Sequence, residues 1–372
     1  MINFSGRTPA AYLGPESLFE REIQQNLNKI SQRIRIMYKI QQKQRDISID
    51  YARGIAIIMV YVGHSILYYP PGLFAECVWS PYLRNMILSC NMPVFFMISG
   101  LLLGLSKKSN IEVAKAKIKK LLIPYLVTMA IVVVGKFFMP ASMAMNPLNG
   151  GVGDMLMDVF VYGGDRWFVY VLMWIFLLAI PLRPLASSKI LLVIISGLFL
   201  MSMSVEFPRY FLMGDVFWFM GFFLLGMYLN PFFVDFRKWN TKYALGIILT
   251  FVVLNIVFVI QLISIPLMRT VVLPITGSIC ILTISYLMDD ACKKLGYEPK
   301  VVKYIAYCGR YSLQFYLFTF AYPVIRMFVV NTLHVTSPFL IFSLVLIMQL
   351  VIMTLIVELT RNVKILKIPM GY

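Results

Sequence analysis

The sequence predicts an all-α fold, a polytopic transmembrane helix bundle of about ten spans. Hydrophobic residues make up 60% of the 372 residues and charged residues only 14%, and the mean hydropathy is +0.79. Soluble domains are about 45–50% apolar and about 25% charged. A membrane-crossing helix needs about 20 apolar residues, so this length holds about ten with short connections. The expected spans are residues 52–69, 86–105, 121–139, 166–182, 190–204, 211–229, 243–264, 271–288, 306–328 and 339–358.

The basic residues are distributed unevenly between the connections. The formal net charge is +17. With a cytoplasmic N-terminus, the inner connections and termini carry 26 Lys and Arg, and the outer connections carry six. This division follows the positive-inside rule and explains the charge through contact with membrane lipid, without nucleic acid. An even number of spans leaves both termini in the cytoplasm.

Residues 1–45 are expected to form a cytoplasmic arm, and residues 46–372 the membrane domain. The arm is too long and polar for the start of a signal peptide, and no small-residue cleavage site follows it. Apolar residues recur in it at spacings of four and three, which predicts a short amphipathic helix on the anionic inner leaflet. A helix that joins copies of the chain into a homo-oligomer is the alternative, although two heptads are short for a coiled coil. The apolar positions are Ile23, Leu27, Ile30, Ile34 and Met37.

The first span carries the most informative residues. Asp50 and Arg53 stand at its start, and His64, one of two histidines in the chain, lies deep inside it. Eleven residues are about three helical turns, so Arg53 and His64 share a face roughly 16 Å apart. Ionisable groups within a span are costly and indicate a functional site. Alternatively, Arg53 pairs with Asp50 at the surface, and His64 is a hydrogen-bonded structural residue.

The next two spans offer weaker signals. The second contains Pro93, which frees a backbone carbonyl, and the small residues Ser99 and Gly100, a pattern typical of a kinked helix that another helix approaches closely. A basic segment with six lysines over residues 106–120 precedes the third span. Such lysines contact anionic lipid, or they form a cradle for phosphates. The five cysteines show no paired spacing, so we expect neither a disulfide framework nor a metal site.

Several motifs together resemble the integral-membrane acyltransferase-3 family. These proteins are multi-span O-acyltransferases of bacterial surface glycans and include fucose 4-O-acetylase-like proteins. The resemblance covers about residues 46–360. The motifs are Asp50-x-x-Arg53-Gly54 with Gly63-His64-Ser65, Met92-Pro93-x-Phe95-Phe96-x-x-Ser99-Gly100, Arg166-Trp167-Phe168-Val169, Phe219-Met220-Gly221-Phe222-Phe223-Leu224-Leu225-Gly226-Met227 and Cys308-Gly309-Arg310-Tyr311-Ser312-Leu313.

The resemblance implies a catalytic role for His64 and an essential role for Arg53, with Asp50 beside them. The family's basic Arg-x-x-Arg element, implicated in acyl-CoA use, falls here on lysines, which lack the bidentate fork of arginine. Cys90-Asn91 and Tyr316-Leu317-Phe318 stand where many relatives have a histidine, so His64 carries more of the chemistry. The expected acyl-CoA residues are Lys117, Lys119 and Lys120, and the expected substrate-binding residues are Arg166, Trp167, Asn91 and Ser99.

We therefore expect an enzyme of the bacterial inner membrane that moves an acyl group, most simply acetyl, from cytosolic acetyl-CoA to a hydroxyl of a surface or lipid-linked glycan. A neutral imidazole is the natural base to remove the hydroxyl proton. The alternative is a proton-coupled transporter or flippase, which would also use intramembrane His and Arg. Against it, the sequence has no inverted hydropathy repeat and no paired broken helices. A noncatalytic scaffold is a third alternative.

Overall fold

The all-α membrane fold is confirmed in the computed structural model. It describes residues 46–67, 74, 77–138, 151–230, 241–259, 265–319, 322–367 and 369–372, and every regular element in these ranges is a helix. The amphipathic helix expected over 23–37 lies outside the described residues. Within the described ranges, six helices are long and apolar enough to cross a membrane, and a count of about ten stays a prediction. The six segments are Trp79–Leu105, Asn110–Phe138, Val152–Leu185, Tyr210–Tyr228, Met268–Leu295 and Pro338–Asn362, and four of them join two or more consecutive helical elements.

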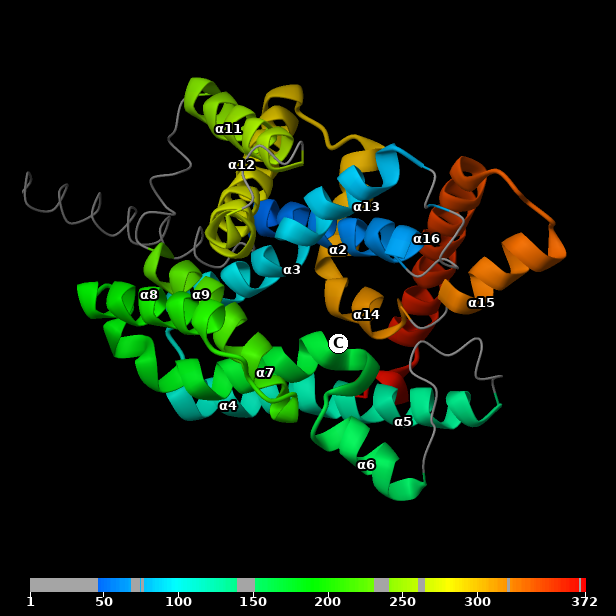
Figure 1. The fold of residues 1–372 in the computed structure, drawn as a ribbon, viewed down its shortest axis with the longest axis horizontal. Coiled ribbons are helices and arrows are strands. Elements are labelled where there is room, and N and C mark those ends of the chain that lie inside the picture. The colour runs from blue at the N-terminus through cyan, green and yellow to red at the C-terminus, as the bar shows by residue number, and fades with distance from the viewer. Residues whose placement is uncertain are drawn as a thin grey trace, which may run out of the picture. The chain divides into compact units, whose positions relative to one another are not determined.

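Helix α2 (Ile47–Leu67) lies at the centre of the bundle. At 21 residues it is long enough to cross a membrane, since each residue rises 1.5 Å. It is not among the six because Asp50, Arg53 and His64 make it more polar. Five helices pack against it (Figure 1): α3 (Trp79–Leu105), α12 (Leu273–Leu295), α13 (Lys300–Arg310), α14 (Ser312–Leu317) and α16 (Pro338–Asn362).

Two helix crossings bring backbone directly against backbone. Where α3 meets α9 (Met213–Tyr228), a Cβ on Gly100 would lie 1.8 Å from the Phe223 carbonyl oxygen. The contact is reciprocal, because a Cβ on Gly226 would lie 1.9 Å from the carbonyl oxygen of Met97. Only glycine permits this approach. The motif glycines of the second and sixth expected spans therefore hold α3 and α9 together.

The same arrangement joins α2 to α13. A Cβ on Gly54 would lie 2.0 Å from the Ile305 carbonyl oxygen, and one on Gly309 would lie 1.7 Å from the Asp50 carbonyl oxygen. Gly54 and Gly309 belong to two different motifs of the sequence. The structure therefore gives both motifs a packing role that fixes the helix carrying His64.

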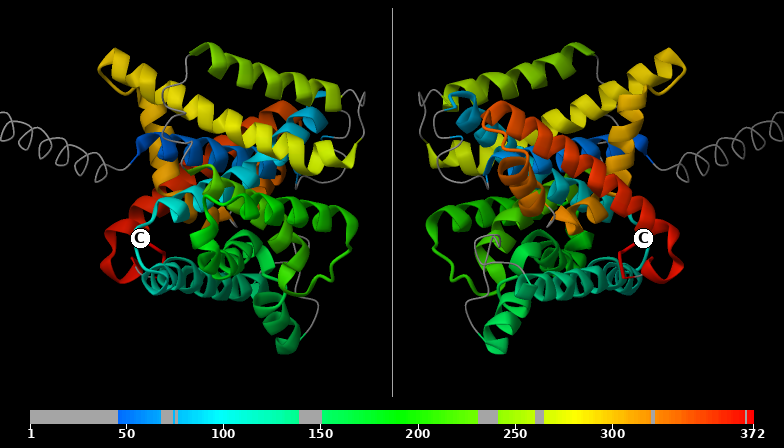
Figure 2. Two further views of the ribbon diagram at one scale, coloured as in Figure 1. Left: turned by 90° about the vertical axis from the view of Figure 1, so that its left-hand side faces the viewer. Right: turned by 90° about the vertical axis from the view of Figure 1, so that its right-hand side faces the viewer.

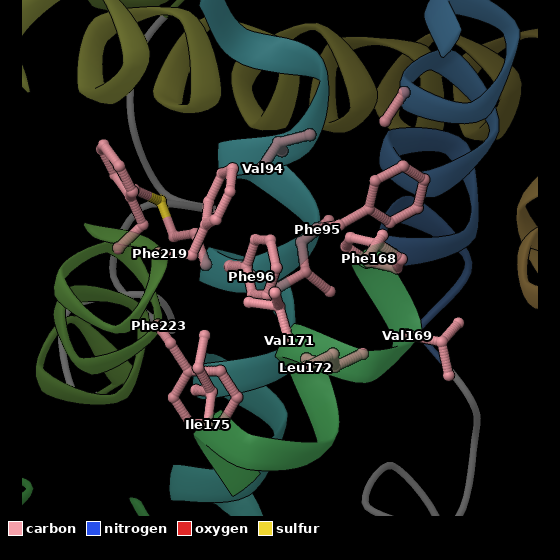
Figure 3. Close-up of a cluster of buried hydrophobic side chains, with 14 of the residues drawn as sticks. Val94, Phe95, Phe96, Phe168, Val169, Val171, Leu172, Ile175, Phe219 and Phe223 are labelled. Atoms are coloured by element: carbon pink, nitrogen blue, oxygen red, sulfur yellow. The ribbon is translucent and has the colours of Figure 1, made fainter. Parts of the chain in front are cut away.

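Aromatic side chains fill the space between α3, α7 (Trp167–Ala179) and α9 (Figure 3). The rings of Phe96 and Phe219 stack with centroids 4.3 Å apart, and Phe168 meets Phe96 edge-on at 5.0 Å. Such pairs add stability beyond the area they bury. They anchor the first turn of α7, and hence the residues just before it.

The continuous span expected over 306–328 is wrong. The structure has three short helices there: α13, which already begins at Lys300, α14, and α15 (Tyr322–Met327). The chain leaves the helix after Gly309 and the exposed Arg310, where α13 runs against the α2 backbone. Pro323 favours a new helix start, because proline suits the first helical turn.

The remaining helices surround this centre. Figure 2 shows α4 and α5 on one side of the bundle and α11 and α12 on the opposite side. A π-turn over Ile118–Leu122 joins α4 to α5, and a reciprocal pair of hydrogen bonds between Ser109 and Glu112 caps α4. The α-helices not yet given are α4 (Asn110–Lys117), α5 (Ile123–Phe138), α6 (Val152–Phe160), α8 (Lys189–Ser204) and α11 (Thr241–Val259).

Candidate functional site

His64 is held in the form that a general base requires. Its side chain is half-buried, and Nδ1 lies 2.7 Å from the carbonyl oxygen of Val60, one turn earlier. A carbonyl oxygen only accepts, so this geometry assigns the hydrogen to Nδ1 and leaves Nε2 as the acceptor. The ring of Tyr322 packs against the imidazole with centroids 5.4 Å apart. The orientation of His64 is thus fixed from both its own helix and α15.

Arg166 is the largest fully buried side chain of the described residues, with 2% of its surface exposed. Its guanidinium lies within electrostatic reach of His64 and of three tyrosines on α2, α5 and α14. The turn η3 (Gly164–Arg166) contacts α5 and α7, and α14 contacts both α2 and α5. We call the set Tyr61, Tyr125, Arg166 and Tyr316 the tyrosine–arginine cluster.

Hydrogen bonds to backbone fix the tyrosines of this cluster. The hydroxyl of Tyr61 donates to the Phe315 carbonyl oxygen at 2.7 Å, which ties α2 to α14. The hydroxyl of Tyr316 accepts from the Phe168 N–H at 3.1 Å, which ties α14 to α7. The hydroxyl of Tyr125 donates to the Val159 carbonyl oxygen. The surroundings of His64 are therefore held by contacts between helices far apart in the sequence.

A buried ion pair lies beside Arg166. Lys136 Nζ is 2.9 Å from Asp165 Oδ2, and the two side chains are only 6% and 13% exposed. Arg166 Nη1 donates to the backbone carbonyl oxygen of Asp165 at 3.0 Å. The carboxylate of Asp158 is close enough to act on both Lys136 and Asp165. Charges this deep are stable only among partners.

A second group of cations lies at the start of α2. Lys117 is half-buried, its Nζ is 3.9 Å from the centroid of the Phe176 ring, and its charge interacts with those of Arg53 and Lys120. The structure thus brings together the first-span arginine and the lysine segment. Like charges repel, so a bound anion would stabilise them. Lys119 and Lys120 are exposed, and Asp50 is buried with 2% of its surface accessible.

The other three expected substrate-binding residues lie among packed helices. Asn91 is 4% exposed, and its Oδ1 accepts from the Met92 N–H within its own helix. Trp167 packs on Phe219 with ring centroids 5.7 Å apart. Ser99 is half-buried beside the crossing of α3 and α9. A substrate role for these three residues stays a prediction.

Sequence reasoning missed most of the environment of His64. Tyr61 could have been found, because it lies one turn before His64 on the same face of α2. Tyr316 is part of a segment already noted for lacking a histidine. No local pattern indicates that Lys136 meets Asp165 or that Tyr322 meets His64. In the part of the chain that the structure describes, no three His, Cys, Asp or Glu side chains could hold a metal ion.

A comparison with known proteins finds one family whose model matches the chain. A family model described as an acyltransferase domain matches residues 46–358. No curated protein matches the chain, and no solved structure does. The match spans α2 to most of α16 and therefore includes both His64 and the cations at the start of α2.

Proposed function

The chain belongs to the acyltransferase-3 family of membrane acyltransferases, and from this membership we propose that it transfers an acetyl group from cytosolic acetyl-CoA to a hydroxyl of a surface or lipid-linked glycan. The observation that supports this most is the arrangement on α2. Arg53, joined by Lys117, lies three turns from His64 on one helical face. Family membership favours acyl transfer over the transporter or flippase alternative.

The cations suit the phosphates of the donor. Arg53 offers a fork of N–H groups that matches phosphate oxygens, and Lys117 adds a point charge. With the basic connections in the cytoplasm, this group faces the side where acetyl-CoA is found. The pantetheine arm would then extend along α2 and bring the thioester to His64. The protein would lie in the bacterial inner membrane with both termini cytoplasmic.

The proposed reaction follows from the protonation of His64. Nε2 removes the proton from the acceptor hydroxyl as its oxygen attacks the thioester carbonyl carbon. The C=O electron pair moves onto the carbonyl oxygen and forms a tetrahedral oxyanion. When this pair returns, the C–S bond breaks, and the thiolate of CoA takes the proton from the imidazolium. The products are an O-acetyl ester and free CoA, and His64 is regenerated.

The acceptor and the acyl group are tested directly by glycan analysis. Surface and lipid-linked glycans from cells with and without the protein would be compared by mass spectrometry. We expect a 42 Da increment (about the mass that replacing a hydroxyl hydrogen by acetyl adds) only when the protein is present. Identical glycan profiles would contradict the proposal.

Lys117→Met should raise the KM for acetyl-CoA by about tenfold or more, because a hydrogen bond to a charged group is worth about 1.5–3 kcal/mol. Methionine keeps the apolar packing on Phe176 but removes the charge. The rate of CoA release by the purified protein in liposomes measures the effect. Lys115→Met is the matched control, since Lys115 is exposed on the same segment and is not one of the expected acyl-CoA residues. Equal changes in both variants would argue against a donor site at Lys117.

A further inference from the structure

Arg166 is a buried cation close enough to His64 for their charges to interact. Its guanidinium is almost completely buried and lies within electrostatic reach of His64. Burying a charge costs several kcal/mol even after relaxation, so a protein rarely does so without a use for it. The position beside a base, deep in the bundle, is unusual for a residue that only anchors a helix at the membrane surface.

We propose that Arg166 stabilises the oxyanion formed at the acyl carbonyl, and that the buried Lys136–Asp165 ion pair positions it. This inference rests on the proposed function and gives the proton transfer and the stabilisation of the oxyanion to two different residues. His64 handles the proton, while Arg166 faces the carbonyl oxygen. An oxyanion is best stabilised by preorganised donors in a site that excludes water.

The hydrogen bonds of the cluster favour Arg166 for this task. The hydroxyls of Tyr61 and Tyr125 already donate hydrogen bonds to backbone carbonyl oxygens. Arg166 presents five N–H groups in a rigid fork, so it serves more than one acceptor at once. It is therefore the charged donor of the cluster.

The local backbone explains how Arg166 is held. It ends the η3 turn just before α7, and Gly163 and Gly164 precede it with φ of 70° and 47°. Glycine adopts this left-handed conformation without strain. The backbone carbonyl of Asp165 accepts from Arg166, and its carboxylate pairs with Lys136 on α5. Lys136 thus acts through Asp165, as a positioning residue.

The test uses purified protein in liposomes with acetyl-CoA, and with water as the acceptor, so that release of the CoA thiol is measured without any glycan. We expect Arg166→Gln to lower kcat by roughly 100- to 1,000-fold, the usual effect of losing an oxyanion donor. The KM for acetyl-CoA should change little, because the phosphates bind elsewhere. Arg166→Lys should restore part of the rate.

A sugar-binding role for Arg166 gives a different result. The hydrolysis of acetyl-CoA would then be unchanged in Arg166→Gln, and that outcome would overturn the inference. Failure of the proposed function is distinguishable, since the wild-type protein would itself release no more CoA than His64→Ala. That outcome also removes the basis of the inference.

Lys136 provides a second test if Arg166→Gln does not fold. Lys136→Met should lower kcat at an unchanged KM for acetyl-CoA, whereas Lys136→Arg, which keeps the ion pair, should restore kcat. Thermal unfolding in detergent separates this from a structural role. Lower stability with an unchanged kcat in Lys136→Met would overturn the positioning role.

Discussion

The His64→Ala protein is expected to insert and fold normally and to lose almost all acyl transfer. Nε2 is the acceptor left by the hydrogen bond from Nδ1 to Val60, and alanine offers no replacement. General-base catalysis contributes about 10²- to 10⁴-fold, so the rate should fall by at least the lower figure. Release of CoA from acetyl-CoA by equal amounts of folded protein measures the loss.

The second histidine of the chain is the matched control. His334 is exposed, with φ of 50°, and it lies in a connection between α15 and α16. His334→Asn suits this backbone conformation, because Asn tolerates the left-handed region. We expect its activity to equal that of the wild type. A fall in the rate of less than about tenfold in His64→Ala would be too small for an essential base and would contradict the assignment of His64 as the general base.

Gly309→Ala should destabilise the whole bundle more than most single-methyl changes. The added Cβ would lie 1.7 Å from the Asp50 carbonyl oxygen and 2.8 Å from the Gly54 nitrogen, so α13 must move off α2. Overpacking typically costs about 1–3 kcal/mol, and a backbone clash of this depth belongs at the upper end or beyond. We expect a lower melting temperature in detergent and a lower yield of folded protein, and both can be measured directly.

Gly197→Ala is the control for this effect. Gly197 lies within α8, and nothing stands within 4 Å of its added Cβ. Alanine there should leave stability unchanged or raise it by about 0.4–1 kcal/mol through the unfolded state. If both variants melt at the same temperature, the close crossing of α2 and α13 is not what holds the helix of His64.

The predictable part of the site is the part that lies on one helix. Arg53 and His64 share a face because they are three turns apart on α2, and helix geometry alone gives that result. The interaction of Arg53 with Lys117 agrees with the topology that the basic connections predict, which places both near the inner surface. By contrast, the surroundings of Arg166 depend on α2, α5 and α14, which are far apart in the sequence. No local periodicity contains that information.

The span expected over residues 306–328 was wrong for a related reason. Hydropathy averages over residues and therefore joins 306–328 into one span. It does not detect that Gly309 touches the α2 backbone or that the helix is interrupted at Tyr311. Helix α2 shows the opposite case, since it lies where the first span was expected although its polar residues lower its hydropathy.

The close crossing of α2 and α13 has a consequence for turnover. Main chains in contact at two reciprocal points resist sliding and rotation past each other, so under the proposed function the imidazole would keep its place through a reaction cycle. Donor and acceptor would then travel to a fixed centre from opposite membrane faces. Carriers that rock one half of the molecule against the other work differently, because their cargo site is uncovered by the movement of helices.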